Sequence, residues 1–190
     1  MPAQRTALLV IDMINRFDFE GGRALGIAAS RCVPVIARLR ARFDAAKAPV
    51  IYVNDNFMHW LSDFRELVAE CRMIEGPAAR IAGALSPRPG DYQVLKPKHS
   101  AFLGTPLEIL LAQLEVRRSV LAGIAADSCI LATAQDANMR DFRLWIPADA
   151  VAAQTPARRA GALGLARQAL GADVRSTRVV EGLFPQEGAS

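Results

Sequence analysis

The chain has 190 residues, 52% hydrophobic and 22% charged, which indicates a folded globular protein and excludes a disordered segment; we expect a single domain over residues 1–190. The net charge of +4 does not indicate a nucleic-acid partner, because the arginines are scattered among acidic residues in helical patterns rather than gathered in a basic stripe. No apolar run is long enough to span a bilayer and the N-terminus lacks a signal-peptide layout, so we expect a cytoplasmic protein without a membrane partner.

Apolar segments rich in strand-forming residues alternate with helical patterns along the chain. We expect strands near residues 6–11, 49–53, 92–95, 119–122, 142–146 and 174–177. We expect helices near residues 25–46, 61–73, 105–114, 127–140 and 155–170. The segment from Arg80 to Asp91, rich in Pro and Gly, is predicted to be a loop. This alternation predicts an α/β fold, a Rossmann-like three-layer α/β/α arrangement around a mainly parallel six-stranded sheet.

The cysteines and lysines are few and unevenly placed. Cys32, Cys71 and Cys129 are an odd number without metal-ligand spacing, so neither a disulfide framework nor a metal site is expected from them. Of the 23 basic residues three are lysines, and two of these, Lys96 and Lys98, fall in one tripeptide. A lysine ammonium is a compact point charge, which a planar guanidinium cannot easily replace beside a nucleophile.

Three chemically active side chains follow three different predicted strands. In open parallel sheets the carboxyl ends of the strands meet at one edge, where ligands bind. Asp12 follows the first strand, Lys96 the third, and Cys129 the fourth, in the first turn of a helix. Lys96 and the helix start would favour a thiolate, the nucleophilic form of cysteine, and Asp12 could accept the thiol proton and return it to a leaving amine. We therefore predict that Asp12, Lys96 and Cys129 are catalytic and that the sulfur attacks a carbonyl carbon.

Other residues near the strand ends are candidates for binding the substrate or stabilising the oxyanion. The backbone N–H groups of Ala125 and Cys129 could form an oxyanion hole. Candidate substrate-binding residues are Phe17, Asn54, Phe57, Trp60 and Phe102. The aromatic members of this set could instead be core residues, His99 is interpreted as a surface or rim residue, and Asp127 as a helix N-cap. Each of the three catalytic candidates, considered alone, could have a purely structural role. The prediction therefore depends on all three lying at the same edge of the sheet.

Three segments resemble motifs of the isochorismatase-like cysteine hydrolases, a superfamily that includes nicotinamidases and N-carbamoylsarcosine amidases. They are Leu8–Phe17, Leu95–Thr105 and Gly123–Ala137, and the resemblance extends in order over nearly the whole chain. It implies a six-stranded parallel sheet, a triad of Asp12, Lys96 and Cys129, a thioester intermediate, a cis peptide bond between Ile124 and Ala125, and a homodimer or homotetramer. Lys98 is the alternative candidate for the lysine of the triad, but the spacing from Lys96 to Ser100-Ala-Phe102 fits the family motif better.

The departures from the family pattern concern the metal and the substrate. Nicotinamidases bind a metal through Asp-x-His after the second strand and a further histidine, whereas here His59 lies four residues from Asp55 and the chain has two histidines. We therefore predict no metal and no cofactor, with recruitment of a metal by Asp55 and His59 as the competing possibility. Vinyl-ether-cleaving isochorismatases do not depend on a cysteine at this position. We expect cleavage of a C–N bond in a small-molecule amide or ureide; the alternatives are ether hydrolysis, and a non-catalytic small-molecule binder or thiol sensor.

Overall fold

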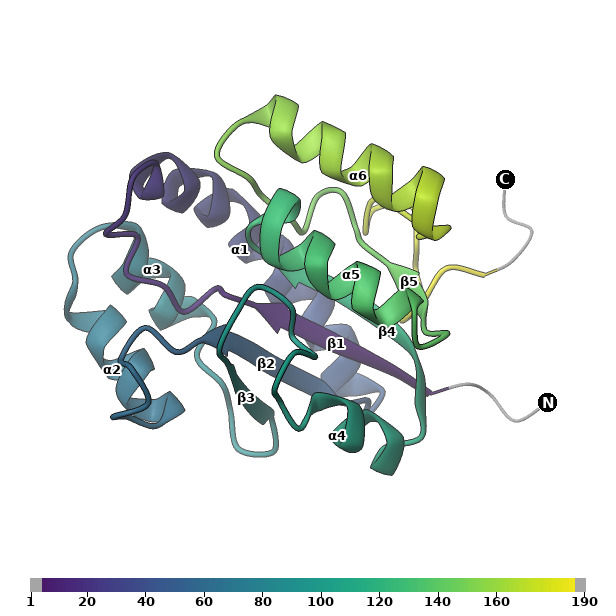
Figure 1. Cartoon of the computed structure of the whole chain (residues 1–190), viewed down its shortest axis with the longest axis horizontal. Coiled ribbons are helices and arrows are strands. Elements are labelled where there is room, and N and C mark those ends of the chain that lie inside the picture. The colour runs from purple at the N-terminus through teal and green to yellow at the C-terminus, as the bar shows by residue number, and fades with distance from the viewer. Residues whose placement is uncertain (1–4, 187–190) are drawn as a thin grey trace.

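The computed structural model describes residues 5–186 and has a parallel sheet at its centre. Within the described residues the sheet has five strands in the order β3-β2-β1-β4-β5 (Figure 1). The strands are β1 (Arg5–Ile11), β2 (Val50–Asp55), β3 (Tyr92–Lys96), β4 (Val116–Gly123) and β5 (Arg143–Trp145). The α-helices are α1 (Gly22–Ala45), α2 (Phe64–Met73), α3 (Pro77–Ala84), α4 (Leu107–Gln113), α5 (Leu131–Asn138) and α6 (Pro156–Leu170). The predicted α/β class and parallel sheet are confirmed.

Helices cover both faces of the sheet because successive strand residues point to opposite sides. On β1, Leu8 and Val10 pack with the apolar faces of α1, α2 and α3. Leu9 and Ile11 pack instead with α4, α5 and α6. In Figure 1, α4, α5 and α6 lie in front of the sheet and α1 runs behind it. β1 and β2 are therefore buried over almost their whole length, whereas β3, at the edge of the sheet, exposes Tyr92 and Gln93.

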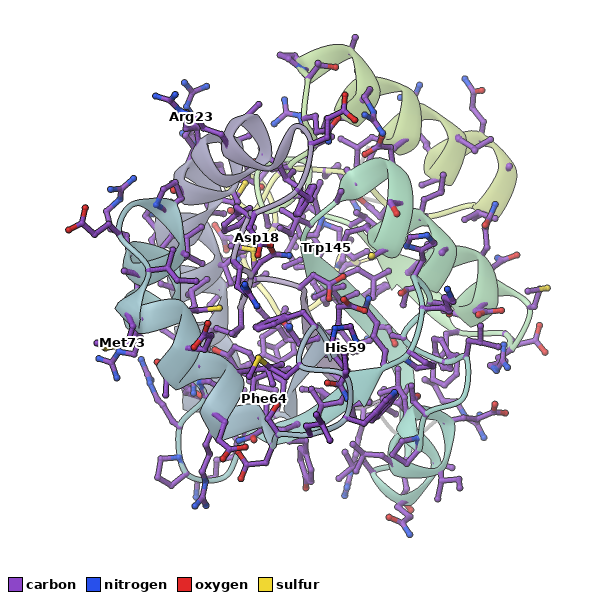
Figure 2. All side chains as sticks on the ribbon, turned by 60° about the vertical axis from the view of Figure 1, so that its left-hand side comes forward. Asp18, Arg23, His59, Phe64, Met73 and Trp145 are labelled. Carbon is purple, nitrogen blue, oxygen red and sulfur yellow. The ribbon has the colours of Figure 1, made fainter. Side chains whose placement is uncertain are left out.

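The predicted sixth strand, residues 174–177, is wrong. Asp173 forms only an isolated parallel bridge to Trp145, which is fully buried and is labelled near the centre of Figure 2. Beyond this bridge, side chains bind the backbone: Asp173 Oδ1 accepts from the Arg175 N–H at 2.8 Å, and the Trp145 indole donates to the Arg175 carbonyl at 2.8 Å. Asp149 Oδ1 accepts from the Thr177 N–H at 2.9 Å. These groups are therefore not available for a sheet ladder.

The predicted loop from Arg80 to Asp91 is wrong in its first part, because α3 extends to Ala84. Gly76, with φ 97°, precedes this helix, and Pro77 occupies its first turn, where a missing N–H costs nothing. Ile81 is fully buried in the cluster that α1 also contributes to. The Pro and Gly residues on which the loop prediction rests, Pro87, Pro89 and Gly90, all lie beyond Ala84, so they do not interrupt this helix.

The strand order reverses at β1, and this reversal locates the ligand-binding edge. β2 and β3 lie on one side of β1, and β4 and β5 on the other. In such sheets a crevice opens beyond the carboxyl ends of the two strands at the reversal, here β1 and β4. Gly123, at the end of β4, has φ 122°, and a Cβ there would lie 2.1 Å from the Ile11 carbonyl oxygen. Glycine thus lets the chain after β4 pass close to β1.

Candidate active site

Asp12 begins the chain segment that leaves β1 and is held from both its backbone and its side chain. Its N–H donates to the Val53 carbonyl at 2.9 Å, which continues the β1–β2 ladder by one residue. Its Oδ1 accepts from the Asp55 N–H at 2.7 Å. The residue has φ 52° and is 4% exposed. Its second carboxylate oxygen remains for another partner.

That partner is Lys96, the last residue of β3. Lys96 is 1% exposed, and its Nζ lies 3.0 Å from Asp12 Oδ2 and 3.6 Å from Cys129 Sγ. The β2–β3 register pairs Lys96 with Asp55, so the lysine side chain reaches across β2 to the end of β1. Lys98, the competing candidate, is exposed. The structure therefore brings together Asp12, Lys96 and Cys129 as the sequence predicts.

Cys129 lies in a π-helical turn, Ala126–Ile130, that precedes α5. The turn is closed by a hydrogen bond from the Ile130 N–H to the Ala125 carbonyl at 3.1 Å, and such wide turns occur frequently at functional sites. The Ile124–Ala125 peptide bond is cis, as the resemblance implied. Cys129 itself is half-buried, between the sheet edge and solvent.

Burial dominates the protonation of the site. It raises the pKa of Asp12, and the Lys96 charge only partly opposes this. For Lys96, burial acts to lower the pKa, but Asp12 and Cys129 together outweigh it, so the pKa is raised. Burial first, and then the Asp12 charge, raise the pKa of Cys129 to about 12 against the opposing effect of Lys96. These effects favour the protonated thiol of Cys129, contrary to the expectation that Lys96 and the helix start favour a thiolate.

Two of the predicted substrate-binding residues are engaged elsewhere. Asn54 is 1% exposed, and both of its amide N–H groups donate to backbone carbonyls, those of Ile14 at 2.8 Å and Asp55 at 3.1 Å. Phe102 is 5% exposed, and its ring packs against Phe142 at 5.9 Å between centroids. Asn54 therefore fixes the loop after β1, and Phe102 belongs to the core beside α5.

The other three aromatic candidates lie in the loops after β1 and β2. Phe17 is 9% exposed in the core beside α1. Phe57 is partly buried, with the Arg16 guanidinium 5.9 Å from its ring centroid. Trp60 is 60% exposed. Of the aromatic set, Phe57 and Trp60 are thus the residues with surface left for a ligand.

Three further polar residues lie beside the triad: His99, which the sequence indicates as a surface or rim residue, and Ser128 and Asn56, for which it predicts no role. His99 Nδ1 lies 3.7 Å from Cys129 Sγ and 3.2 Å from Ser128 Oγ. Asn56 donates its N–H to the Lys96 carbonyl at 3.3 Å, and among the described residues its buried Nδ2 has no hydrogen-bond partner. Asn56 could have been found by its place immediately after β2, and Ser128 by its place next to Cys129.

Two further expectations concern single side chains. Asp127 does not cap the helix, because the turn has no side-chain cap and Asp127 Oδ2 instead accepts from Arg158 Nε on α6. Within residues 5–186, no group of three or more His, Cys, Asp or Glu side chains is placed to hold a metal ion. None of the described helices is both long and apolar enough to cross a membrane.

Comparison with known proteins agrees with this geometry. The isochorismatase domain family model matches residues 6–179. The isochorismatase family protein YaaI of Bacillus subtilis is 36% identical, with 88% of this chain and 92% of that protein covered. The ureidoacrylate amidohydrolase RutB of Methylorubrum extorquens is 30% identical, with coverages of 85% and 75%.

A solved structure shows the same fold. The N-carbamoylsarcosine amidase from Thermoplasma acidophilum superimposes with a TM-score of 0.73 at 29% identity, over 94% of this chain and 100% of that one. This structural match, the match to the family model and the alignments with YaaI and RutB each cover most of the chain. The chain therefore belongs to the isochorismatase family of hydrolases.

Proposed function

We propose that the protein hydrolyses the C–N bond of a small amide or ureide through a thioester on Cys129. The observation that carries this function is the position of Lys96 Nζ, 3.0 Å from Asp12 Oδ2 and 3.6 Å from Cys129 Sγ. A carboxylate, an ammonium and a thiol within bonding reach supply a proton acceptor, a charge stabiliser and a nucleophile. The names of RutB and the N-carbamoylsarcosine amidase point to ureido or carbamoyl substrates in two relatives, which supports the substrate class.

The first half of the proposed reaction forms the thioester. Asp12 Oδ2 and Cys129 Sγ both lie beside Lys96 Nζ, at 3.0 and 3.6 Å, and we propose that Asp12 takes the thiol proton while Sγ attacks the carbonyl carbon. A standing thiolate is not required, because the proton leaves as the S–C bond forms. The carbonyl oxygen gains the negative charge, and the backbone N–H groups of Ala125 and Cys129 are the proposed oxyanion donors. Lys96 keeps Asp12 ionised before attack and stabilises the charge that develops beside it.

The second half releases the products. The C–N bond breaks as Asp12 returns its proton to the leaving nitrogen, which leaves Cys129 acylated. Water then adds to the acyl carbon, the C–S bond breaks, and the thiol is restored. Phe57 and Trp60 are the proposed apolar contacts of the substrate, and Asn56 Nδ2 is the proposed donor to one of its oxygens.

The experiment compares wild type and Cys129→Ala in ammonia release from a panel of primary amides and ureides. We expect at least one ureide or amide to be hydrolysed by wild type, with turnover lost in Cys129→Ala and an acyl adduct detected on Cys129 by intact-protein mass spectrometry. Equal turnover by both proteins would reject the nucleophile.

We further propose that the enzyme acts in the cytoplasm as a homodimer or homotetramer. Light scattering after gel filtration would test the assembly, and a monomeric mass would reject it. The exposed side chain of Trp60 could be buried against a second subunit. If so, dilution would dissociate the subunits, expose the indole to water and shift its fluorescence.

A further inference from the structure

The sulfur of Cys129 is contacted from two sides, and the proposed acylation uses only one of them. On the buried side lie Lys96, 3.6 Å away, and Asp12, both nearly inaccessible to solvent. On the outer side lies His99, an exposed residue whose Nδ1 is 3.7 Å from Sγ. Imidazole is the commonest general base in enzymes, and a base can act through one intervening water. The outer side therefore offers a proton acceptor where water has access.

Ser128 orients this imidazole. Its Oγ lies 3.2 Å from His99 Nδ1 and 4.0 Å from Cys129 Sγ, so the hydroxyl lies close to both groups. With the ring proton on Nε2, Nδ1 is an unprotonated acceptor that lies within reach of both Ser128 Oγ and Cys129 Sγ, and rotation of the Ser128 hydroxyl frees its single lone pair for a water proton. Ser128 is adjacent to Cys129 in the same π-turn, so this contact fixes His99 relative to the nucleophile.

We infer that His99 is the general base that hydrolyses the Cys129 thioester, so that acylation and deacylation use different proton acceptors. This inference rests on the proposed function. A water molecule from solvent adds its oxygen to the acyl carbon, and His99 Nδ1 takes one of its protons. The tetrahedral intermediate then collapses, the C–S bond breaks, and the sulfur receives the proton from His99. The products are the free acid and the restored thiol, with neutral His99 ready for another turnover.

The test measures deacylation by itself, so it does not require the natural substrate. p-Nitrophenyl acetate is used to acetylate the enzyme, excess ester is removed by desalting, and decay of the Cys129 adduct is followed by intact-protein mass spectrometry. Cys32 and Cys71 are buried, and Cys129→Ala controls for any labelling elsewhere. The variants are His99→Gln, Ser128→Ala and, as a matched control on the same exposed segment, Lys98→Gln.

In His99→Gln we expect an acetyl adduct to form as in wild type but to decay about a hundredfold more slowly, the usual contribution of a general base. Ser128→Ala should slow the decay less, and Lys98→Gln should match wild type. Hydroxylamine, a stronger nucleophile than water, should remove the adduct from His99→Gln at a rate close to that of wild type. This rescue separates a lost base from a distorted site, in which hydroxylamine attack would also be slow.

The two hypotheses fail in different ways. If wild type forms no adduct on Cys129, the nucleophile assignment is wrong and the role of His99 is rejected with it. If the adduct forms and decays equally fast in wild type and His99→Gln, the role of His99 is overturned while the proposed function stands. Slow hydroxylamine attack on the His99→Gln adduct would also overturn the inference.

Discussion

Replacing Lys96 by methionine tests whether the buried ion pair holds the active site together. Methionine keeps an unbranched apolar side chain of similar length but removes the charge that lies 3.0 Å from Asp12 Oδ2. At this distance the attraction between unit charges is about 5 kcal/mol with an effective dielectric constant of about 20. Because Asp12 is 4% exposed, water cannot replace the lost partner. We expect a loss of about 3–5 kcal/mol in the free energy of unfolding, the usual cost of breaking a buried pair.

The same change should remove catalysis through Asp12. Without the ammonium, burial raises the pKa of Asp12 unopposed by Lys96, which favours the protonated carboxyl and weakens Asp12 as an acceptor of the thiol proton. We expect acetylation of Cys129 by p-nitrophenyl acetate to slow at least about a hundredfold. Lys98→Met, which removes an exposed lysine two residues away, should change neither stability nor acetylation appreciably.

A double-mutant cycle separates the ion pair from general disruption of the site. Asp12→Asn retains an oxygen that can accept from the Asp55 N–H, so the loop after β1 keeps its hydrogen bond. The double variant Asp12→Asn/Lys96→Met leaves no unpaired charge and should lose much less stability than the two single losses added together, while acetylation stays slow. Urea unfolding gives the three free energies. If the loss in the double variant equals the sum of the two single losses within about 0.5 kcal/mol, Asp12 and Lys96 are not coupled and the argument from the ion pair is refuted.

Further predictions concern stability. Burial raises the pKa of Cys71 to about 12 from its ordinary 9.0, so the unfolded state loses this proton first and the free energy of unfolding falls as the pH rises above 9. In Cys71→Ala this alkaline fall should be shallower by about 1.4 kcal/mol per pH unit, as measured by urea unfolding between pH 9 and 11; an unchanged slope would contradict it. Gly123→Ala places a Cβ 2.1 Å from the Ile11 carbonyl oxygen at φ 122° and should cost about 3 kcal/mol, whereas Gly164→Ala in α6, where a Cβ meets nothing within 4 Å, should gain about 0.5–1 kcal/mol. Thermal melts of both variants check this pair, and equal melting temperatures would count against the close approach of β4 and β1.

The composition of the active site follows from the sequence because it depends on strand order. Asp12 directly follows β1, Lys96 is the last residue of β3, and Cys129 lies in the turn that follows β4. Parallel crossovers bring all carboxyl ends to one edge, so residues far apart in the chain are predicted to meet without knowledge of side-chain geometry. The cis peptide bond at Ile124–Ala125 was predictable from the motif resemblance alone.

Which polar side chains at that edge are bound within the protein depends on hydrogen-bond partners from distant parts of the chain. Asn54 lies near the end of β2 and Asn56 directly follows that strand. Asn54 donates to the Ile14 carbonyl, whereas the buried Nδ2 of Asn56 has no hydrogen-bond partner among the described residues. Residues 174–177 have a strand-like sequence, but Asp149 takes the Thr177 N–H and no sixth strand forms.

The chain by itself determined which chemical groups gather at the sheet edge, because strand periodicity and the direction of parallel connections are local and topological properties. Only the tertiary structure decided their protonation. Burial of the sulfur and the nearby Asp12 charge raise the pKa of Cys129 to about 12 against the opposing effect of Lys96. Burial and distance arise from packing between segments more than thirty residues apart, which no pattern within one segment records.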